Sequence, residues 1–203
     1  ALIENRIVLH HYYRGSKEGK KDVAAAQAQL TKAIETTRKA VERFPKDTNL
    51  GYQFALAHNH LGVIESEEGK DTLALPWFRQ AIDLYNTHCV RDGSVQDSFQ
   101  QAEVLSWLGS AKESAKRLNN EDEILRLASE GLEVGKDCPT NAGKQALAGL
   151  LSARAELQKK RGKIQDAIAD YEECVSITRP AWEKAKWHWY LHSAVVGPYL
   201  QLS

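Results

Sequence analysis

The sequence has no methionine, only three cysteines and no surplus of either charge. Its 203 residues include 27 basic and 27 acidic side chains, so the formal net charge is zero. Because phosphate binding needs clustered positive charge, we expect no nucleic-acid partner. Cys89, Cys138 and Cys174 have no metal-site spacing, and an odd number this widely separated is not typical of a disulfide framework. The cysteines therefore favour a reducing compartment, and we expect a cytoplasmic location.

Long apolar segments are also lacking. No run approaches the ~18 apolar residues that span a bilayer, and the N-terminus lacks the basic and apolar segments of a secretion signal. We therefore expect no membrane partner. The chain begins at Ala1 and has no methionine, which favours a piece of a larger protein. His188 and His192 could share a metal, but without a third ligand the case is weak, so we expect neither a metal nor another cofactor.

What the sequence does contain is an internal repeat. Pairs of small residues stand 19 positions apart in three places, which are Gly62 and Ala81, Gly109 and Ala128, and Ala155 and Cys174. Starting from Ala33, the second members recur at intervals of 48, 47 and 46 residues. Such self-similarity is typical of an array of helical units, and arrays of this kind usually bind other molecules.

The second unit is the clearest. At helical period it reads as two amphipathic helices joined by a glycine-containing turn. We expect Gly62 to let the two helices approach closely, with Phe78 filling the space between them. Asp71 or Thr72 is expected to cap the second helix. With Thr72 as the cap, Pro76 falls in the first turn, where its missing N–H costs little.

The third and fourth units follow the same plan. The third repeats it around Gly109, although Glu121 stands where the other units have alanine. Gly135 is interpreted as the left-handed residue that caps the end of this unit's second helix. The fourth unit closely matches the second, and Cys174 is expected to be a small packing residue.

These patterns predict an all-α fold with one array over residues 1–203, made of about four helical hairpins and a C-terminal capping helix. The hairpins are expected at approximately 1–44, 48–90, 95–135 and 141–178, and the capping helix at 181–196. Thr178 and Pro180 predict the start of the capping helix. Its aromatic stripe, Trp182, Ala185 and Trp189, would close the exposed end of the core, with a binding surface as the alternative.

The second unit resembles a tetratricopeptide repeat, a helix-turn-helix unit of 34 residues. The resemblance rests on Leu-Gly62, a turn, and then Ala74, Phe78 and Ala81. Here the period is about 47 residues, and the extra length lies between hairpins. Extended arrays of this kind are similar to those of kinesin light chains and of bacterial signalling proteins, including Ser/Thr kinases, and residues 56–62 are particularly similar to the latter. The resemblance implies an α-α superhelix, or solenoid.

In this family, ligands usually lie in a concave groove lined by the first helices. The resemblance therefore implies that a protein or peptide binds along mainly polar positions of those helices. The positions are Asn59, Val63, Ser66, Glu103, Ser106, Ser110, Glu113, Ser152, Glu156 and Lys159. The alternative for each is a plain solvated helix face. The clamp of lysine, asparagine and arginine with which chaperone-binding members hold a terminal carboxylate is not present.

The preferred hypothesis is a non-catalytic interaction or scaffold module that forms the regulatory part of a larger signalling protein. Two alternatives stay open. Arg6 and His11 fit the loose Arg-x4-His pattern of some helical ribonucleases, which would make the protein a nuclease-like hydrolase, although about one such pair is expected by chance. The other alternative is a structural module that forms homo-oligomers through the Trp-rich C-terminal helix.

Overall fold

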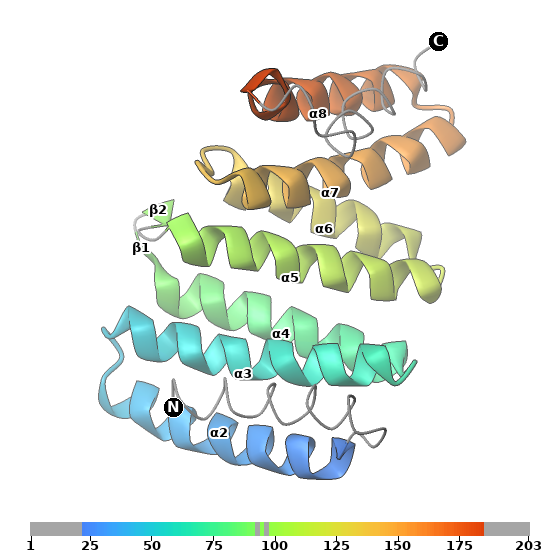
Figure 1. Cartoon of the computed structure of the whole chain (residues 1–203). Coiled ribbons are helices and arrows are strands. Elements are labelled where there is room, and N and C mark those ends of the chain that lie inside the picture. Colours follow the sequence, from blue (N-terminus) through green and yellow to red (C-terminus); the bar gives the residue numbers. More distant parts are fainter. Residues whose placement is uncertain (1–21, 92–93, 96–97, 185–203) are drawn as a thin grey trace. The chain divides into compact units, whose positions relative to one another are not determined.

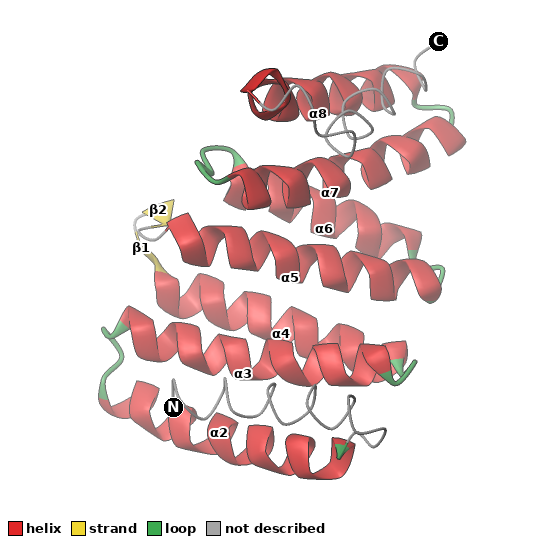
Figure 2. Ribbon diagram, viewed as in Figure 1, coloured by secondary structure: helices red, strands yellow, loops and turns green. Residues whose placement is uncertain are grey.

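The computed structural model describes residues 22–91, 94–95 and 98–184, and nearly all of this part of the chain is helical (Figures 1 and 2). Apart from one pair of two-residue strands, its elements are α-helices. The all-α fold class expected from the sequence is therefore confirmed. The chain divides into two compact units, Ala1–Gln96 and Asp97–Ser203, which we describe separately.

The first unit contains three described helices and the strand pair. Its elements are α2 (Val23–Arg43), α3 (Thr48–Glu67), α4 (Asp71–Cys89), β1 (Val90–Arg91) and β2 (Ser94–Val95). Helix α3 lies between α2 and α4 and packs against both (Figure 1). The strands are antiparallel, with Val90 opposite Val95. The repeat pattern gave no sign of these strands.

The second unit contains four described helices. They are α5 (Ser98–Arg117), α6 (Glu121–Gly135), α7 (Asn141–Lys160) and α8 (Ile164–Lys184). Helix α6 packs against α5 and α7, α5 also packs against α7, and α7 packs against α8. The first helices of the third and fourth sequence units, α5 and α7, are thus direct neighbours.

Side-chain caps begin several of the helices. A cap side chain accepts a hydrogen bond from a backbone N–H that has no partner within the helix. The caps are Asp22 for α2, Asp47 for α3, Asn120 for α6 and Thr140 for α7. Helix α4 differs, because its cap residue Lys70 makes no side-chain cap bond. The expectation that Asp71 or Thr72 caps α4 is therefore wrong.

One turn geometry closes the three hairpins α3–α4, α5–α6 and α7–α8. Each turn contains a residue with positive φ, hereafter the turn residues, which are Gly69 (73°), Asn119 (55°) and Gly162 (75°). The next backbone N–H donates to the carbonyl five residues earlier. These closing amides are Lys70 to Glu65, Asn120 to Ala115 and Lys163 to Gln158, each at 2.8 Å. Such six-to-one closure is the Schellman motif, which satisfies a free helix-end carbonyl and turns the chain back.

The second hairpin has the close contact that the sequence predicts. A Cβ atom on Gly62 would lie only 2.7 Å from a ring carbon of Phe78. Phe78 is 1% exposed and Ala74 is fully buried. In the fourth hairpin the equivalent residues, Ala155, Ala167 and Tyr171, form one buried cluster. Two hairpins therefore share the same contact of a small residue, an alanine and an aromatic ring.

The third hairpin does not have this contact. No atom in the described part of the chain lies within 4 Å of a Cβ atom built on Gly109, so the close approach expected there is wrong. Instead, Leu105 of α5 and Leu147 of α7 approach Gly135, at 3.1 and 2.9 Å from its ideal Cβ position. Gly135 ends α6 without a positive φ, so its interpretation as a left-handed cap is also wrong. Its hydrogen side chain makes room for two leucines.

Both helix-internal prolines lie elsewhere than expected. Pro76 is the sixth residue of α4 rather than a first-turn residue, because the helix begins at Asp71. Pro180 lies inside α8, which continues to Lys184. A separate helix starting at residue 181 is therefore not formed, and residues 185–196 of the expected capping helix lie outside the described residues. A proline removes only one helix hydrogen bond, which a long, packed helix can tolerate.

Alanine at Gly62 and at Gly109 should have opposite effects on stability. Gly62→Ala is expected to lower the free energy of unfolding by about 1–3 kcal/mol, because its methyl group would overlap the Phe78 ring. Gly109→Ala should raise it by up to about 1 kcal/mol, since alanine is the better helix former and has free space. Urea denaturation of both variants measures this, and equal effects would contradict the different packing of the two hairpins.

Substitution of the turn residues tests the closing geometry. Gly162→Ala should destabilise the protein by about 1–2 kcal/mol, because a Cβ atom is unfavourable at positive φ. Asn119→Gly should be neutral or stabilising by a few tenths of a kcal/mol, since glycine adopts this conformation freely. Thermal unfolding of both variants shows whether each change raises or lowers stability. A Gly162→Ala variant as stable as the parent chain would be inconsistent with a left-handed turn.

Candidate functional site

The candidate positions on α3 are largely enclosed. Asn59 is only 6% exposed, while Val63 and Ser66 are half-buried. The amide oxygen of Asn59 and the Nδ1 atom of His60 are buried and have no hydrogen-bond partner among the described residues. A partner could reach Asn59 only after local movement, so this end of the predicted site is poorly accessible in the structure.

The two histidines of α3 lie in the core. His58 is 2% exposed, its Nδ1 atom is 2.9 Å from the carbonyl oxygen of Phe54, and its ring packs against Phe54 and Trp77. This is the core role expected for His58. His60 is 7% exposed, and burial lowers its pKa to about 4. Both side chains are therefore neutral packing groups near pH 7.

The candidate positions on α5 and α7 are more open. Ser106, Glu113, Glu156 and Lys159 are exposed, whereas Glu103, Ser110 and Ser152 are half-buried. Because α5 and α7 pack side by side, these positions lie on two neighbouring helices. Among the residues that the structure describes, none has an atom within 4 Å of an ideal Cβ position on Gly149 of α7, as is also true for Gly109 of α5. We refer to the positions Ser106, Gly109, Ser110, Gly149, Ser152 and Glu156 on these two helices together as the α5–α7 face.

The polar groups of the α5–α7 face bond to other groups of the same chain. The Ser110 hydroxyl donates to the carbonyl oxygen of Ser106 at 3.2 Å. The Ser152 hydroxyl lies 3.5 Å from the sulfur of Cys174. Lys112 lies 2.8 Å from Glu113, and this hydrogen bond lowers the pKa of the Glu113 carboxyl group. The arrangement provides small side chains and scattered charges, without an activated nucleophile.

The thiols of Cys89 and Cys174 are not activated either. Burial raises the pKa of Cys89 to about 12 and that of Cys174 to about 11. Cys174 is fully buried and its thiol donates to the carbonyl oxygen of Ala148 at 3.3 Å, so its predicted packing role is confirmed. Within the described ranges, no group of three or more His, Cys, Asp or Glu side chains could hold a metal ion.

Arg154 makes a polar contact that the sequence analysis missed. Its guanidinium donates to both carboxylate oxygens of Asp170, at 2.8 and 2.6 Å, and to the Ser129 hydroxyl at 3.1 Å. These bonds join α6, α7 and α8. The Arg154 and Asp170 side chains are only 16% and 8% exposed, so the pair is partly desolvated. In the sequence, only their opposite charges and their separation of 16 positions could have indicated this pair.

The exceptional residue Glu121 takes part in a second polar contact. It accepts from Lys160 and Arg161, and Arg161 also donates to Asp122 at 2.9 Å. These bonds lower the pKa of the Glu121 carboxyl group. They connect the start of α6 with the end of α7, so the charged residue at the position of the other units' alanine has partners on the neighbouring helix. The partners are exposed enough for the pairs to contribute little to stability.

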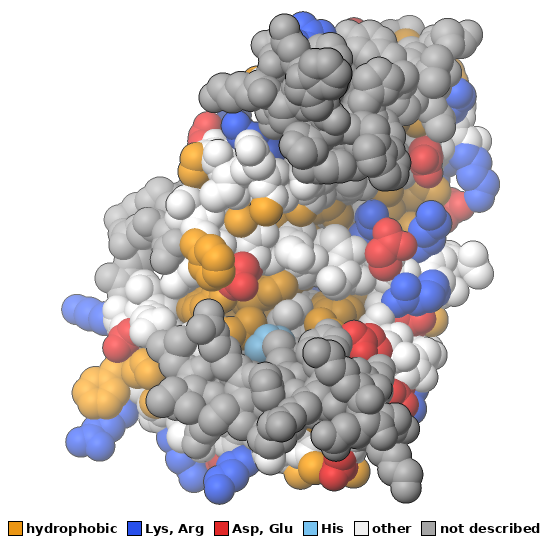
Figure 3. Space-filling model, viewed as in Figure 1, with side chains coloured by type: hydrophobic (Ala, Val, Ile, Leu, Met, Phe, Trp, Pro, Cys, Tyr) orange, Lys and Arg blue, Asp and Glu red, His pale blue; other side chains and the backbone are white. Residues whose placement is uncertain are grey.

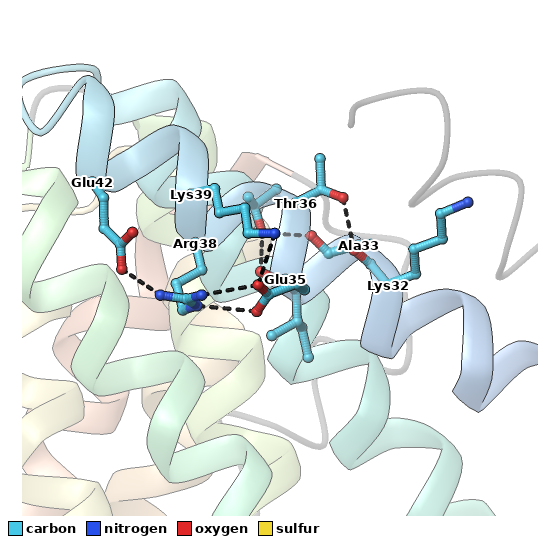
Figure 4. Close-up of polar contacts among 9 residues, drawn as sticks. Lys32, Ala33, Glu35, Thr36, Arg38, Lys39 and Glu42 are labelled. Atoms are coloured by element: carbon cyan, nitrogen blue, oxygen red, sulfur yellow. Dashed lines mark hydrogen bonds and ion pairs between the residues drawn. The ribbon is translucent and has the colours of Figure 1, made fainter.

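The outer face of α2 carries a similar exposed network. Figure 4 shows Arg38 between Glu35 and Glu42, with Lys39 also paired to Glu35. The hydrogen bonds from Arg38 and Lys39 lower the pKa of Glu35 to about 2. On the face drawn in Figure 3, acidic and basic side chains lie close to one another rather than in a field of one sign. These charges indicate a solvated surface.

Several candidate residues cannot be placed. Arg6, His11, His188, His192 and Trp189 lie outside the described residues.

None of the described helices is apolar over a sufficient length to cross a bilayer. No protein-family model, curated protein or solved structure matches this chain.

Breaking the Arg154–Asp170 pair should be strongly destabilising. Arg154→Met leaves the buried Asp170 carboxylate without its partner, and we expect a loss of about 3 kcal/mol in the free energy of unfolding. The double variant Arg154→Met/Asp170→Leu should regain most of this loss, because it leaves no buried charge. Denaturant unfolding of the four proteins in the cycle measures the coupling, and additive losses would contradict a direct interaction.

His60 should make stability depend on pH. Its pKa is lowered from 6.5 to about 4 in the folded chain, so the unfolded chain binds more protons between these values. Stability should therefore fall as the pH decreases from 7, by about 1–2 kcal/mol at pH 5. His60→Leu should remove the contribution of His60 to this dependence of stability on pH. Urea midpoints at pH 7 and 5 test this, and an unchanged slope in the variant would argue against a buried neutral imidazole.

Proposed function

We propose that this chain is a tetratricopeptide-like repeat array that binds a protein or peptide segment and has no catalytic activity of its own. The repeated closing turn of the three hairpins supports the proposal, as does the shared contact in the second and fourth hairpins. Following the sequence resemblance, we further propose that it forms the regulatory part of a larger cytoplasmic signalling protein.

The observation that carries the binding proposal is the α5–α7 face. Glycine within a helix costs about 1 kcal/mol relative to alanine, and no atom of residues 22–91, 94–95 or 98–184 lies where it would exclude a methyl group at Gly109 or Gly149. Packing against the described residues therefore does not account for either glycine. A partner that lies directly on the helix backbones would account for both, since only a hydrogen side chain keeps them accessible.

The proposed mechanism is surface complementarity. The small side chains let a bound segment contact the two helices closely, and Glu113, Glu156 and Lys159 supply charged groups at the edge. In such interfaces a few well-packed contacts carry most of the affinity. Asn59 of α3 is not required, because it is buried.

Site-specific photocrosslinking in cell lysate tests this proposal. A photoreactive amino acid at Glu113, on the exposed edge of the face, should capture a defined partner. The same amino acid at Ser176, which is exposed on α8, should not capture it. Ser106→Arg/Ser110→Arg should reduce capture at position 113 by at least tenfold, because two long cations would fill the space over α5.

The matched control for added charge is Ala169→Arg/Ser176→Arg, which places two arginines on exposed positions of α8. It should leave capture at position 113 unchanged. The circular dichroism of both double variants should equal that of the parent chain. Equal capture at 113 and 176, or capture unaffected by the arginines on α5, would overturn the assignment of the α5–α7 face.

A further inference from the structure

We draw no further inference here: the strongest candidate, the stripe of small residues around Gly109 and Gly149 on the α5–α7 face, belongs to the site already described, and nothing in the structure shows what covers it.

Discussion

The left-handed turn that closes each hairpin is the constraint on which the helix pairs depend. A helix leaves its last carbonyl groups unpaired, and the closing amide satisfies one of them while the positive φ reverses the chain. The turn fixes where the second helix starts relative to the first. The side chains between them can then form a continuous core. Because the same closure occurs three times, the helix pairs are built alike although their sequences differ.

Packing within the pairs follows this constraint only in part. The second and fourth hairpins place a small residue against an aromatic ring, whereas the third has Gly109, Glu121 and Leu125 at the equivalent positions. Without the ring, α6 packs through other residues, and Gly131 and Gly135 make room for leucines of the neighbouring helices. Glu121 is free to pair with the end of α7. In the same hairpin, no described residue lies within 4 Å of a Cβ atom built on Gly109.

Sequence periodicity predicted the helices and the Gly62–Phe78 contact. Small and aromatic residues at helical spacing are compatible with few other ways of packing the two helices together. Periodicity failed at Gly109 because spacing does not give the rotation of one helix about its axis relative to the next. Local capping and proline signals also misplaced the start of α4, which begins at Asp71, and the path of α8, which continues through Pro180. Of the candidate positions on α5 and α7, Ser106, Glu113, Glu156 and Lys159 are exposed, and their role in binding stays a prediction. The sequence could not show that Asn59 is buried, or that Arg154 and Asp170 meet across a turn.

The central claim is that one left-handed closure builds all three hairpins. Nuclear magnetic resonance of the labelled full chain tests it most directly, through the N–H to Hα couplings and distances of the turn residues, with the two Hα atoms of each glycine assigned stereospecifically, and through the exchange rates of the closing amides. The account predicts positive φ at all three turn residues and slow exchange at all three closing amides. Negative φ at any turn residue, or exchange of its closing amide at the rate of an unfolded chain, would contradict it.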